Sequence, residues 1–199
     1  MNVIFALLIL LFAIAVVETD DFFLVPIFLI LLQSAFITEL YFEGSGLETL
    51  LPLILVSLII IPAMLYLVTA KTKRAEEEAI LHGLTSVATL SILVIITYVI
   101  LGTIGFFHLF TLEMANIQWL LIIIGVYGVL VKTDLRKAVA CLTILTGTLH
   151  LFTSGFDLMM DIALLTFSTL LLLMLLYFAY RSYITNGSMS TKDLTTLRQ

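Results

Sequence analysis

The stretch Leu158–Tyr180 reads LMMDIALLTFSTLLLLMLLYFAY, and it decides the fold class of this chain. Asp161 is its only charged residue, and about 20 apolar residues rising 1.5 Å each are enough to cross a bilayer. From Leu164 to Leu176 the apolar residues follow one another without the strict alternation of a membrane β-strand. The stretch therefore predicts a membrane-spanning α-helix, in which every backbone polar group finds its partner inside the segment.

The composition of the whole chain agrees with this interpretation. Of its 199 residues, 62% are hydrophobic and 12% are charged, and the mean hydropathy is +1.22. An ordinary soluble domain is about 45–50% apolar and about 25% charged. A soluble fold of about 150 residues buries only about 70% of the surface of its chain, so it could not hide so much apolar surface. We exclude a soluble enzyme, a disordered protein and, with a net charge of −5 and no basic stripe, a nucleic-acid-binding protein.

The length criterion predicts an all-α transmembrane bundle of about seven spans in a single domain, residues 1–199. This domain divides into an N-terminal four-helix part (1–115), a three-helix part (116–183) and a tail (184–199). The spans are expected at Asn2–Val17, Phe22–Phe42, Leu50–Ala70, Leu84–Phe107, Ile117–Val131, Ala138–Phe152 and Leu158–Tyr180. The first span is expected to stay in the mature protein, because it lacks the basic region of a cleavable signal.

The charges in the connecting segments predict the orientation. With seven spans, all nine basic residues fall on one face of the membrane, and they are Lys71, Lys73, Arg74, Lys132, Arg136, Lys137, Arg181, Lys192 and Arg198. The other face receives only acidic residues, namely Glu43, Glu48, Glu113 and Asp157. Because cytoplasmic loops carry an excess of Lys and Arg, we expect the N-terminus outside and the C-terminus in the cytoplasm.

Several local signals refine the expected bundle. Pro62 lies inside the third span and is expected to kink or break that helix. Asn186-Gly187-Ser188 is expected to end the last helix and leave a polar cytoplasmic tail. Gly125, Gly128 and Gly147 are expected to let helices approach closely. The lone Cys141 is interpreted as a buried small hydrophobic residue.

Four titratable residues near the ends of the spans are candidates for a proton path or for polar contacts. Glu39 is close enough to the end of the second span that we expect its carboxylate to reach water. His150 is interpreted either as an interfacial hydrogen-bonding residue or as a proton carrier. Asp157 and Asp161 share a face at the start of the last span, where the helix dipole favours acidic groups. Alternatively, these aspartates form a proton entry point with His150.

Other kinds of functional residue are missing from the sequence. No Lys or Arg lies in the middle of a span, and spans three to six contain no central Asp or Glu. The chain has no glycine-rich phosphate loop, no paired histidines and no set of cysteines for an iron–sulfur cluster. We therefore expect no catalytic residue, no cofactor and no metal ion in this chain, which would need partner proteins to take part in any reaction.

From about Trp119 onward, the sequence resembles the family of the hydrogenase-4 membrane component E, whose last three helices are similar to the K component of complex I. The resemblance starts with an apolar helix, which is followed by the basic turn Lys132-Thr133-Asp134-Leu135-Arg136-Lys137 and the glycine-containing helix at 138–151. It ends with the tail Leu194-Thr195-Thr196-Leu197-Arg198. It covers about 80 residues well, whereas the first 115 match only in hydropathy and in the Pro62-containing third span.

The resemblance implies a multi-pass component of a complex in a prokaryotic cytoplasmic membrane. Family members belong to the membrane arm of group 4 [NiFe]-hydrogenases, formate hydrogenlyases and related complex-I-like oxidoreductase assemblies, which translocate protons or sodium ions. The implied partners are antiporter-like membrane proteins and membrane proteins similar to the H component of complex I. This chain departs from the family at three polar positions. Leu145 and Thr166 stand where the family carries Glu and Asp, and Leu58–Ile61 with Ser57 replaces a polar or basic residue. The loss of these carboxylates favours a structural role.

Three hypotheses follow from the sequence. The first is a non-catalytic subunit that bridges antiporter-like subunits of a complex-I-like or hydrogenase-type complex. The second is a subunit of a multisubunit cation/proton antiporter or ion-coupled uptake complex without a redox module. The third is a free-standing small transporter, which the lack of buried charges and of internal repeats disfavours.

Overall fold

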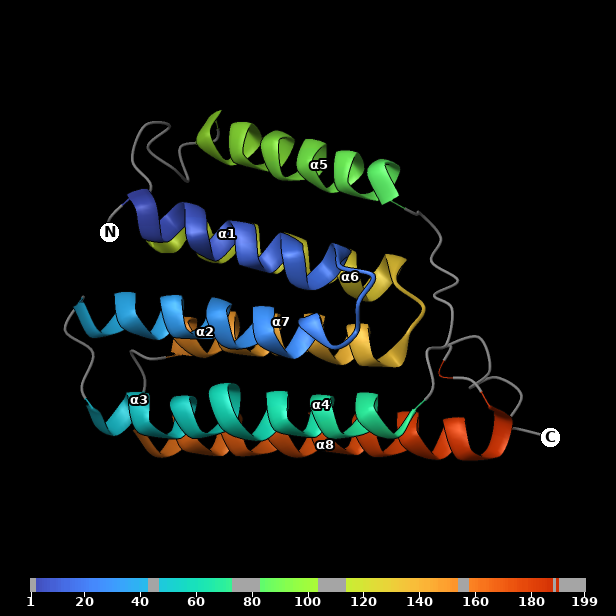
Figure 1. Cartoon of the computed structure of the whole chain (residues 1–199). Helices are drawn as coiled ribbons and strands as arrows, with labels where there is room; N and C mark the ends of the chain where they lie inside the picture. Colours follow the sequence, from blue (N-terminus) through green and yellow to red (C-terminus); the bar gives the residue numbers. More distant parts are fainter. Residues whose placement is uncertain are drawn as a thin grey trace.

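The computed structural model describes residues 3–42, 47–72, 83–103, 114–153, 158–187 and 189 (Figure 1). Every regular element in these ranges is a helix. The helices are α1 (Val3–Glu18), α2 (Leu24–Phe42), α3 (Leu47–Ile54), the π-helix η1 (Leu55–Ile60), α4 (Ile61–Lys71), α5 (Gly83–Thr103), α6 (Met114–Val131), α7 (Leu135–Thr153) and α8 (Leu158–Asn186). The all-helical prediction is therefore confirmed for the described residues.

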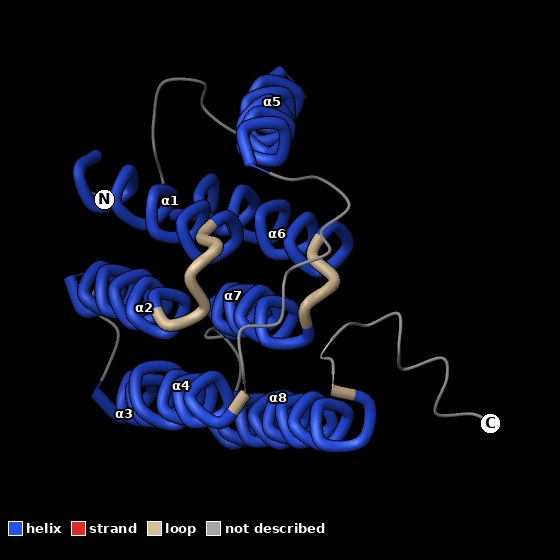
Figure 2. The backbone as a smooth tube through the Cα atoms, turned by 45° about the vertical axis from the view of Figure 1, so that its right-hand side comes forward, coloured by secondary structure: helices blue, strands red, loops and turns tan. Residues whose placement is uncertain are grey.

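The helices lie side by side in two layers (Figures 1 and 2). One layer contains α1, α2 and the continuous run α3–η1–α4, and the other contains α6, α7 and α8. α5 packs outside these layers, against α6 and α1. With α3–η1–α4 counted as one run, successive helices run in opposite directions, so α1 begins at one end of the bundle and α8 finishes at the other (Figure 1).

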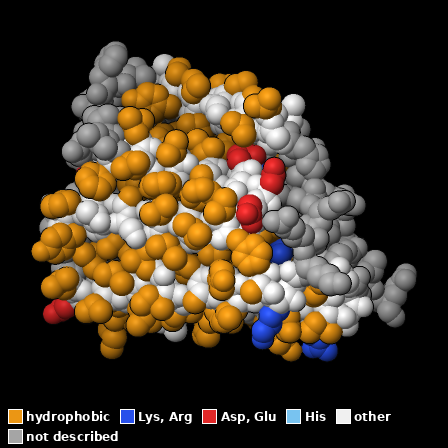
Figure 3. Space-filling view, viewed as in Figure 1, with side chains coloured by type: hydrophobic (Ala, Val, Ile, Leu, Met, Phe, Trp, Pro, Cys, Tyr) orange, Lys and Arg blue, Asp and Glu red, His pale blue; other side chains and the backbone are white. Residues whose placement is uncertain are grey.

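Apolar side chains cover both the interior and the outer surface of the bundle. Ile9, Leu29 and Ile124 are fully buried or nearly so, whereas Leu11 and Phe167 expose more than half of their surface. Figure 3 shows hydrophobic side chains over most of one face, with charged side chains mainly toward one end. A helix that is apolar on all sides is typical of a membrane span rather than of the surface of a soluble protein.

Four helical segments are long and apolar enough to cross a membrane. They are Leu24–Phe42, Leu50–Lys71, Gly83–Ile100 and Ile162–Thr185, and Phe5–Glu18 and Ile117–Val131 are shorter apolar helices. These findings support a membrane protein. Each of the seven expected spans coincides with a described helix or continuous helical run, and α8 extends beyond the expected span end at Tyr180 to the helix end expected at Asn186. Residues 104–107 of the expected fourth span lie outside the described residues.

Pro62 follows a change in helix type, as its sequence position suggested. The π-helix η1 ends at Ile60, and the N–H of Ile61 donates to the carbonyl of Val56, five residues earlier. Proline has no N–H and its ring clashes with the carbonyl four residues before it, so a regular α-helical turn is disfavoured there. The expected break therefore takes the form of a wide π turn.

Glycines set the spacing between α6 and α7, as predicted. A methyl group on Gly125 would lie 2.7 Å from Leu145 Cγ, and one on Gly128 would collide with Cys141 Sγ. Both contacts come from α7, and Cys141 is fully buried. The absence of a side chain at Gly125 and Gly128 therefore allows the two helices to pack closely.

The last helix ends at Asn186, as the sequence predicted, but the environment of Met189 differs from the prediction. Gly187 has a φ of +73° and donates its N–H to the carbonyl of Tyr183, as in a glycine-capped helix end. Met189, expected to begin a polar cytoplasmic tail, is buried, and its carbonyl accepts a hydrogen bond from the N–H of Leu135. The start of the tail therefore packs against the start of α7.

Candidate functional site

The turn between α6 and α7 carries three cationic side chains that are almost completely buried. Lys132, Arg136 and Lys137 expose 3%, 2% and 0% of their surface. Burial of an unpaired charge is very unfavourable, so buried cations require ionic or hydrogen-bonding partners. These partners come from the turn itself, as with Asp134, and from segments distant in the sequence, as with Glu18 and Thr72.

Lys132 pairs with Glu18 at the end of α1. The Lys132 ammonium nitrogen lies 3.1 Å from Glu18 Oε2, and both side chains are nearly buried. The Ser86 hydroxyl donates to Glu18 Oε1 at 2.8 Å and lies 2.9 Å from the Tyr127 hydroxyl. The Tyr127 hydroxyl also donates to the backbone carbonyl of Ser86 at 3.1 Å. This network joins α1, α5 and α6.

Asp134 and Arg136 form a second network at the start of α7. Asp134 Oδ1 accepts the backbone N–H of Arg136 at 2.8 Å, which is the geometry of a helix N-cap. The Arg136 guanidinium donates to both oxygens of Asp134, at 3.0 and 2.7 Å, and to the Thr72 hydroxyl at 3.1 Å. Such two-pronged, charge-assisted hydrogen bonds are among the strongest in proteins. Thr72 directly follows α4, so this network ties α4 to α7.

An aromatic ring from the connection between α1 and α2 completes the arrangement. The Phe22 ring centroid lies 3.8 Å from the Arg136 guanidinium carbon and 5.7 Å from the Lys137 ammonium nitrogen. Cations within about 6 Å of a ring centroid are attracted by its π electrons. We call the whole set the ionic end of the bundle, and it consists of Glu18, Phe22, Thr72, Ser86, Tyr127, Lys132, Asp134, Arg136 and Lys137.

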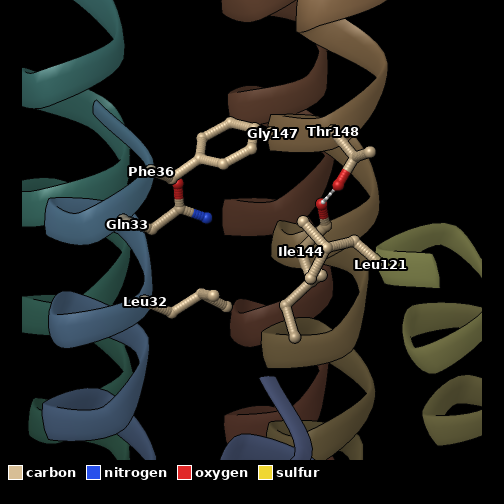
Figure 4. A pocket seen from close by; sticks show the side chains of 7 residues that line it. All are labelled: Leu32, Gln33, Phe36, Leu121, Ile144, Gly147 and Thr148. Atoms are coloured by element: carbon tan, nitrogen blue, oxygen red, sulfur yellow. Dashed lines mark hydrogen bonds between the residues drawn. The ribbon is translucent and has the colours of Figure 1, made fainter. Parts of the chain in front are cut away.

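A small cavity between α2 and α7 contains polar groups in the middle of the bundle (Figure 4). Its volume is about 10 Å³, enough to hold about one water molecule. Gln33 of α2 points toward Gly147 of α7, and a methyl group on Gly147 would lie 3.2 Å from Gln33 Nε2. Gln33 is buried, and its Oε1 accepts no hydrogen bond from the described residues. The lining also includes Thr148, which donates to the carbonyl of Ile144, and it contains no titratable side chain.

The four candidate residues from the sequence have different outcomes. Glu39 lies on α2 and is only 4% exposed, so the expectation that its carboxylate reaches water is wrong. His150 and Asp161 lie in α7 and α8, but their side chains are not described, and Asp157 lies outside the described residues. The proposed grouping of His150 with the aspartates remains a prediction.

Sequence reasoning missed the ionic end. Lys132, Arg136 and Lys137 were interpreted as the charges of a connecting turn and as part of the family resemblance, and their burial was not predicted. Asp134 directly before Leu135 is a helix N-cap signal that could have located the start of α7. The partner Glu18 is separated from Lys132 by more than a hundred residues, and no local pattern links the two.

The expected resemblance to the hydrogenase-4 component E family draws attention to Ser57, Leu145 and Thr166, whose contacts the structure describes. Leu145 packs against Gly125, and the buried Ser57 donates its hydroxyl to the carbonyl of Leu53. Thr166 is exposed and donates to the carbonyl of Ile162 at 2.7 Å. Among the described residues, no three His, Cys, Asp or Glu side chains gather closely enough to hold a metal ion.

Comparison with known proteins identifies no relative. No protein-family model, no curated protein and no solved structure matches the chain.

Proposed function

We propose that this chain is a non-catalytic membrane-arm subunit of a complex-I-like or group 4 [NiFe]-hydrogenase-type ion-translocating complex. In this proposal it crosses the cytoplasmic membrane seven times, with its N-terminus outside and its C-terminus in the cytoplasm. Its main role is structural, because it bridges the antiporter-like subunits of the membrane arm.

The observation that carries the proposal is that the charged side chains at the α6–α7 turn are buried and held by partners. This turn belongs to the segment that resembles the hydrogenase-4 component E family. Its Lys132 pairs with Glu18 of α1, and its Arg136 pairs with Asp134 of the same turn and donates to Thr72 after α4. A group that relays protons must exchange them with water or with a neighbour, whereas Lys132 and Arg136 are held in fixed pairs. The arrangement supports a rigid part of a larger assembly.

The middle of the bundle supports the same role. A proton path through the membrane needs titratable groups at intervals. The positions of the family carboxylates hold Leu145 and Thr166, and the described cavity between α2 and α7 is lined by an amide and a hydroxyl group rather than by an acid. These side chains favour a subunit that supports ion translocation by its neighbours.

The outer surface of the bundle leaves room for such neighbours. α5 buries only 11% of its apolar span within the chain, and Ile92, Ile95 and Ile96 on this helix are exposed. Large exposed apolar surfaces are typical of regions that contact lipid or other subunits. The proposed orientation is supported by the positions of Lys71, Lys132 and Arg181, which lie at the same end of the bundle, opposite Glu48.

Co-purification tests the proposal directly. The chain, tagged at its natural expression level and extracted in mild detergent, is expected to bring down antiporter-like proteins and proteins similar to the H component of complex I. A [NiFe] large subunit and iron–sulfur proteins are expected with them. Recovery of antiporter subunits without redox proteins would instead support the uptake-complex alternative. A monomer that transports a solute by itself in liposomes would contradict both assignments.

Coupled pumping by the purified complex tests the structural role. Asp157→Asn, Asp161→Asn and His150→Ala are each expected to leave the ratio of translocated ions to turnover nearly unchanged. By contrast, Lys132→Met is expected to reduce the amount of assembled complex, because it leaves the Glu18 carboxylate buried without its partner. Loss of pumping at normal assembly in any of the first three variants would show that a proton path passes through this chain.

A further inference from the structure

A groove between α4 and α8 opens on the outer surface of the bundle. Its volume is about 170 Å³, and its lining consists of Met64, Leu67, Val68, Lys71, Leu176, Tyr177 and Tyr180. Apolar protein cavities of about 150 Å³ stay dry and accept a guest of the size of benzene. Leu67 and Tyr177 are 51% and 57% exposed, so the groove is accessible from the side of the bundle. It therefore has room for part of an apolar chain.

One end of the groove is polar. Lys71 is exposed at the last position of α4, and its ammonium nitrogen lies 5.9 Å from the Tyr180 ring centroid. Figure 3 shows Lys and Arg side chains near this end of α4 and α8, next to the apolar surface. Lysine near the end of a membrane helix directs its charge toward the headgroup region, and tyrosine is enriched at the same level. The groove thus combines an apolar slot with a cation at the level of the lipid headgroups.

We propose that this groove binds one anionic glycerophospholipid. The phosphate lies against the Lys71 ammonium group, and one acyl chain follows the groove toward Met64. Seven residues separate Lys71 from Met64, which corresponds to about 10 Å along the helix. A groove of this volume is too small for a partner helix, whose diameter is about 10 Å, but it suits a single acyl chain. The positive charge at its mouth complements a phosphate, and cytoplasmic basic pockets between membrane helices favour anionic headgroups.

Native mass spectrometry of the full-length protein in detergent micelles tests this proposal. Phosphatidylglycerol and phosphatidylcholine with identical acyl chains are the probes. We expect one retained phosphatidylglycerol per chain and weaker retention of phosphatidylcholine. Lys71→Gln is expected to weaken phosphatidylglycerol binding about fivefold, the usual effect of one basic residue near a membrane surface. Leu67→Trp fills the groove and is expected to abolish retention of the lipid.

Two matched variants serve as controls. Arg181→Gln removes an exposed cation next to Tyr180 but outside the groove lining, and Leu170→Trp adds the same bulk at an exposed position elsewhere on α8. Both are expected to keep the bound lipid. Circular dichroism and gel filtration check that each variant is folded.

Three results would overturn the lipid site. They are equal retention of the two lipids, an equal loss of binding in Arg181→Gln and Lys71→Gln, and a dimer of this chain that Leu67→Trp dissociates. The measurement uses the isolated chain and does not depend on which complex contains it. Failure here would leave the proposed function intact, and an unexpected set of co-purified partners would leave the lipid site intact.

Discussion

Lys132 follows α6 with its ammonium group against the Glu18 carboxylate of α1, and this pair shows how single residues stabilise the bundle. Transfer of two charges out of water is unfavourable, and their attraction compensates only when further hydrogen bonds complete the site. Ser86 provides one of these bonds to Glu18. The pair is therefore expected to be sensitive to the loss of either partner.

Substitution of Lys132 tests this dependence. Lys132→Met is expected to lower the free energy of unfolding by about 3–5 kcal/mol, because the Glu18 carboxylate stays buried without a counter-ion. The double variant Glu18→Gln/Lys132→Met is expected to recover most of this loss, since neither buried charge remains. Denaturant titration in mixed micelles, followed by circular dichroism, measures both effects.

The exposed Arg181 provides the control for this experiment. Arg181→Gln removes a positive charge from the same end of the bundle and is expected to change the free energy of unfolding by less than about 0.5 kcal/mol. If the losses in Glu18→Gln and Lys132→Met simply add in the double variant, the two side chains are not energetically coupled.

The identity of single residues predicted their environment only in part. Cys141 is buried, as its apolar neighbours suggested, but Glu39 is buried where we expected it to reach water. A carboxylate near the end of a span is exposed or covered according to which helices lie beside it. This information is not contained in the local sequence around Glu39.

At the scale of helices, the contact between α6 and α7 depends on small residues. Gly128 faces Cys141 and also Val17 of α1, where a methyl group would lie 3.2 Å from Val17 Cγ2. The Cys141 side chain is short and fully buried, so it has little freedom to move aside. Overpacking at this contact would push α6 away from its neighbours.

Gly128→Ala tests this packing. It is expected to lower the free energy of unfolding by about 1–3 kcal/mol, because the added methyl group collides with Cys141 Sγ. Val126→Ala on the exposed side of α6 is the matched control and is expected to have a much smaller effect. The titration in mixed micelles measures both. A neutral Gly128→Ala variant would show that α6 and α7 are not closely packed in solution.

The helical run before Pro62 shows which features of a helix can be predicted from its sequence. Proline predicts a disturbance of the α-helical hydrogen bonds, and the change to a π turn at Leu55–Ile60 agrees with this. The form of the disturbance was not predicted. α4 packs against α8 and α2, and such contacts cannot be read from the local sequence around Pro62.

At the scale of the whole molecule, successive helices run in opposite directions through an apolar bundle. The exposed Asp20 lies at the ionic end of the bundle, whereas the exposed Glu48 lies at the opposite end. If the bundle spans the membrane in the proposed orientation, these two positions face different compartments. Their accessibility therefore reports the orientation of the whole chain.

Cysteine labelling measures this accessibility. In intact cells, a membrane-impermeant thiol reagent is expected to modify Glu48→Cys, whereas Asp20→Cys is modified only after the membrane is opened. Cys141 is fully buried, so the unsubstituted chain is the control and is expected to remain unlabelled. Labelling of both positions in intact cells would contradict the proposed crossing of the membrane.

The sequence alone determined the class of the protein and the approximate positions of its helices. Apolar runs such as Leu164–Leu176 are stable as membrane helices because their backbone hydrogen bonds are internal to each segment, so a local pattern is sufficient. Only the tertiary structure decided which charged residues are buried, which helices are neighbours and where a groove remains. The Glu18–Lys132 pair and the groove beside Lys71 each depend on helices that are distant in the chain, and contacts of this kind arise from packing rather than from any local sequence pattern.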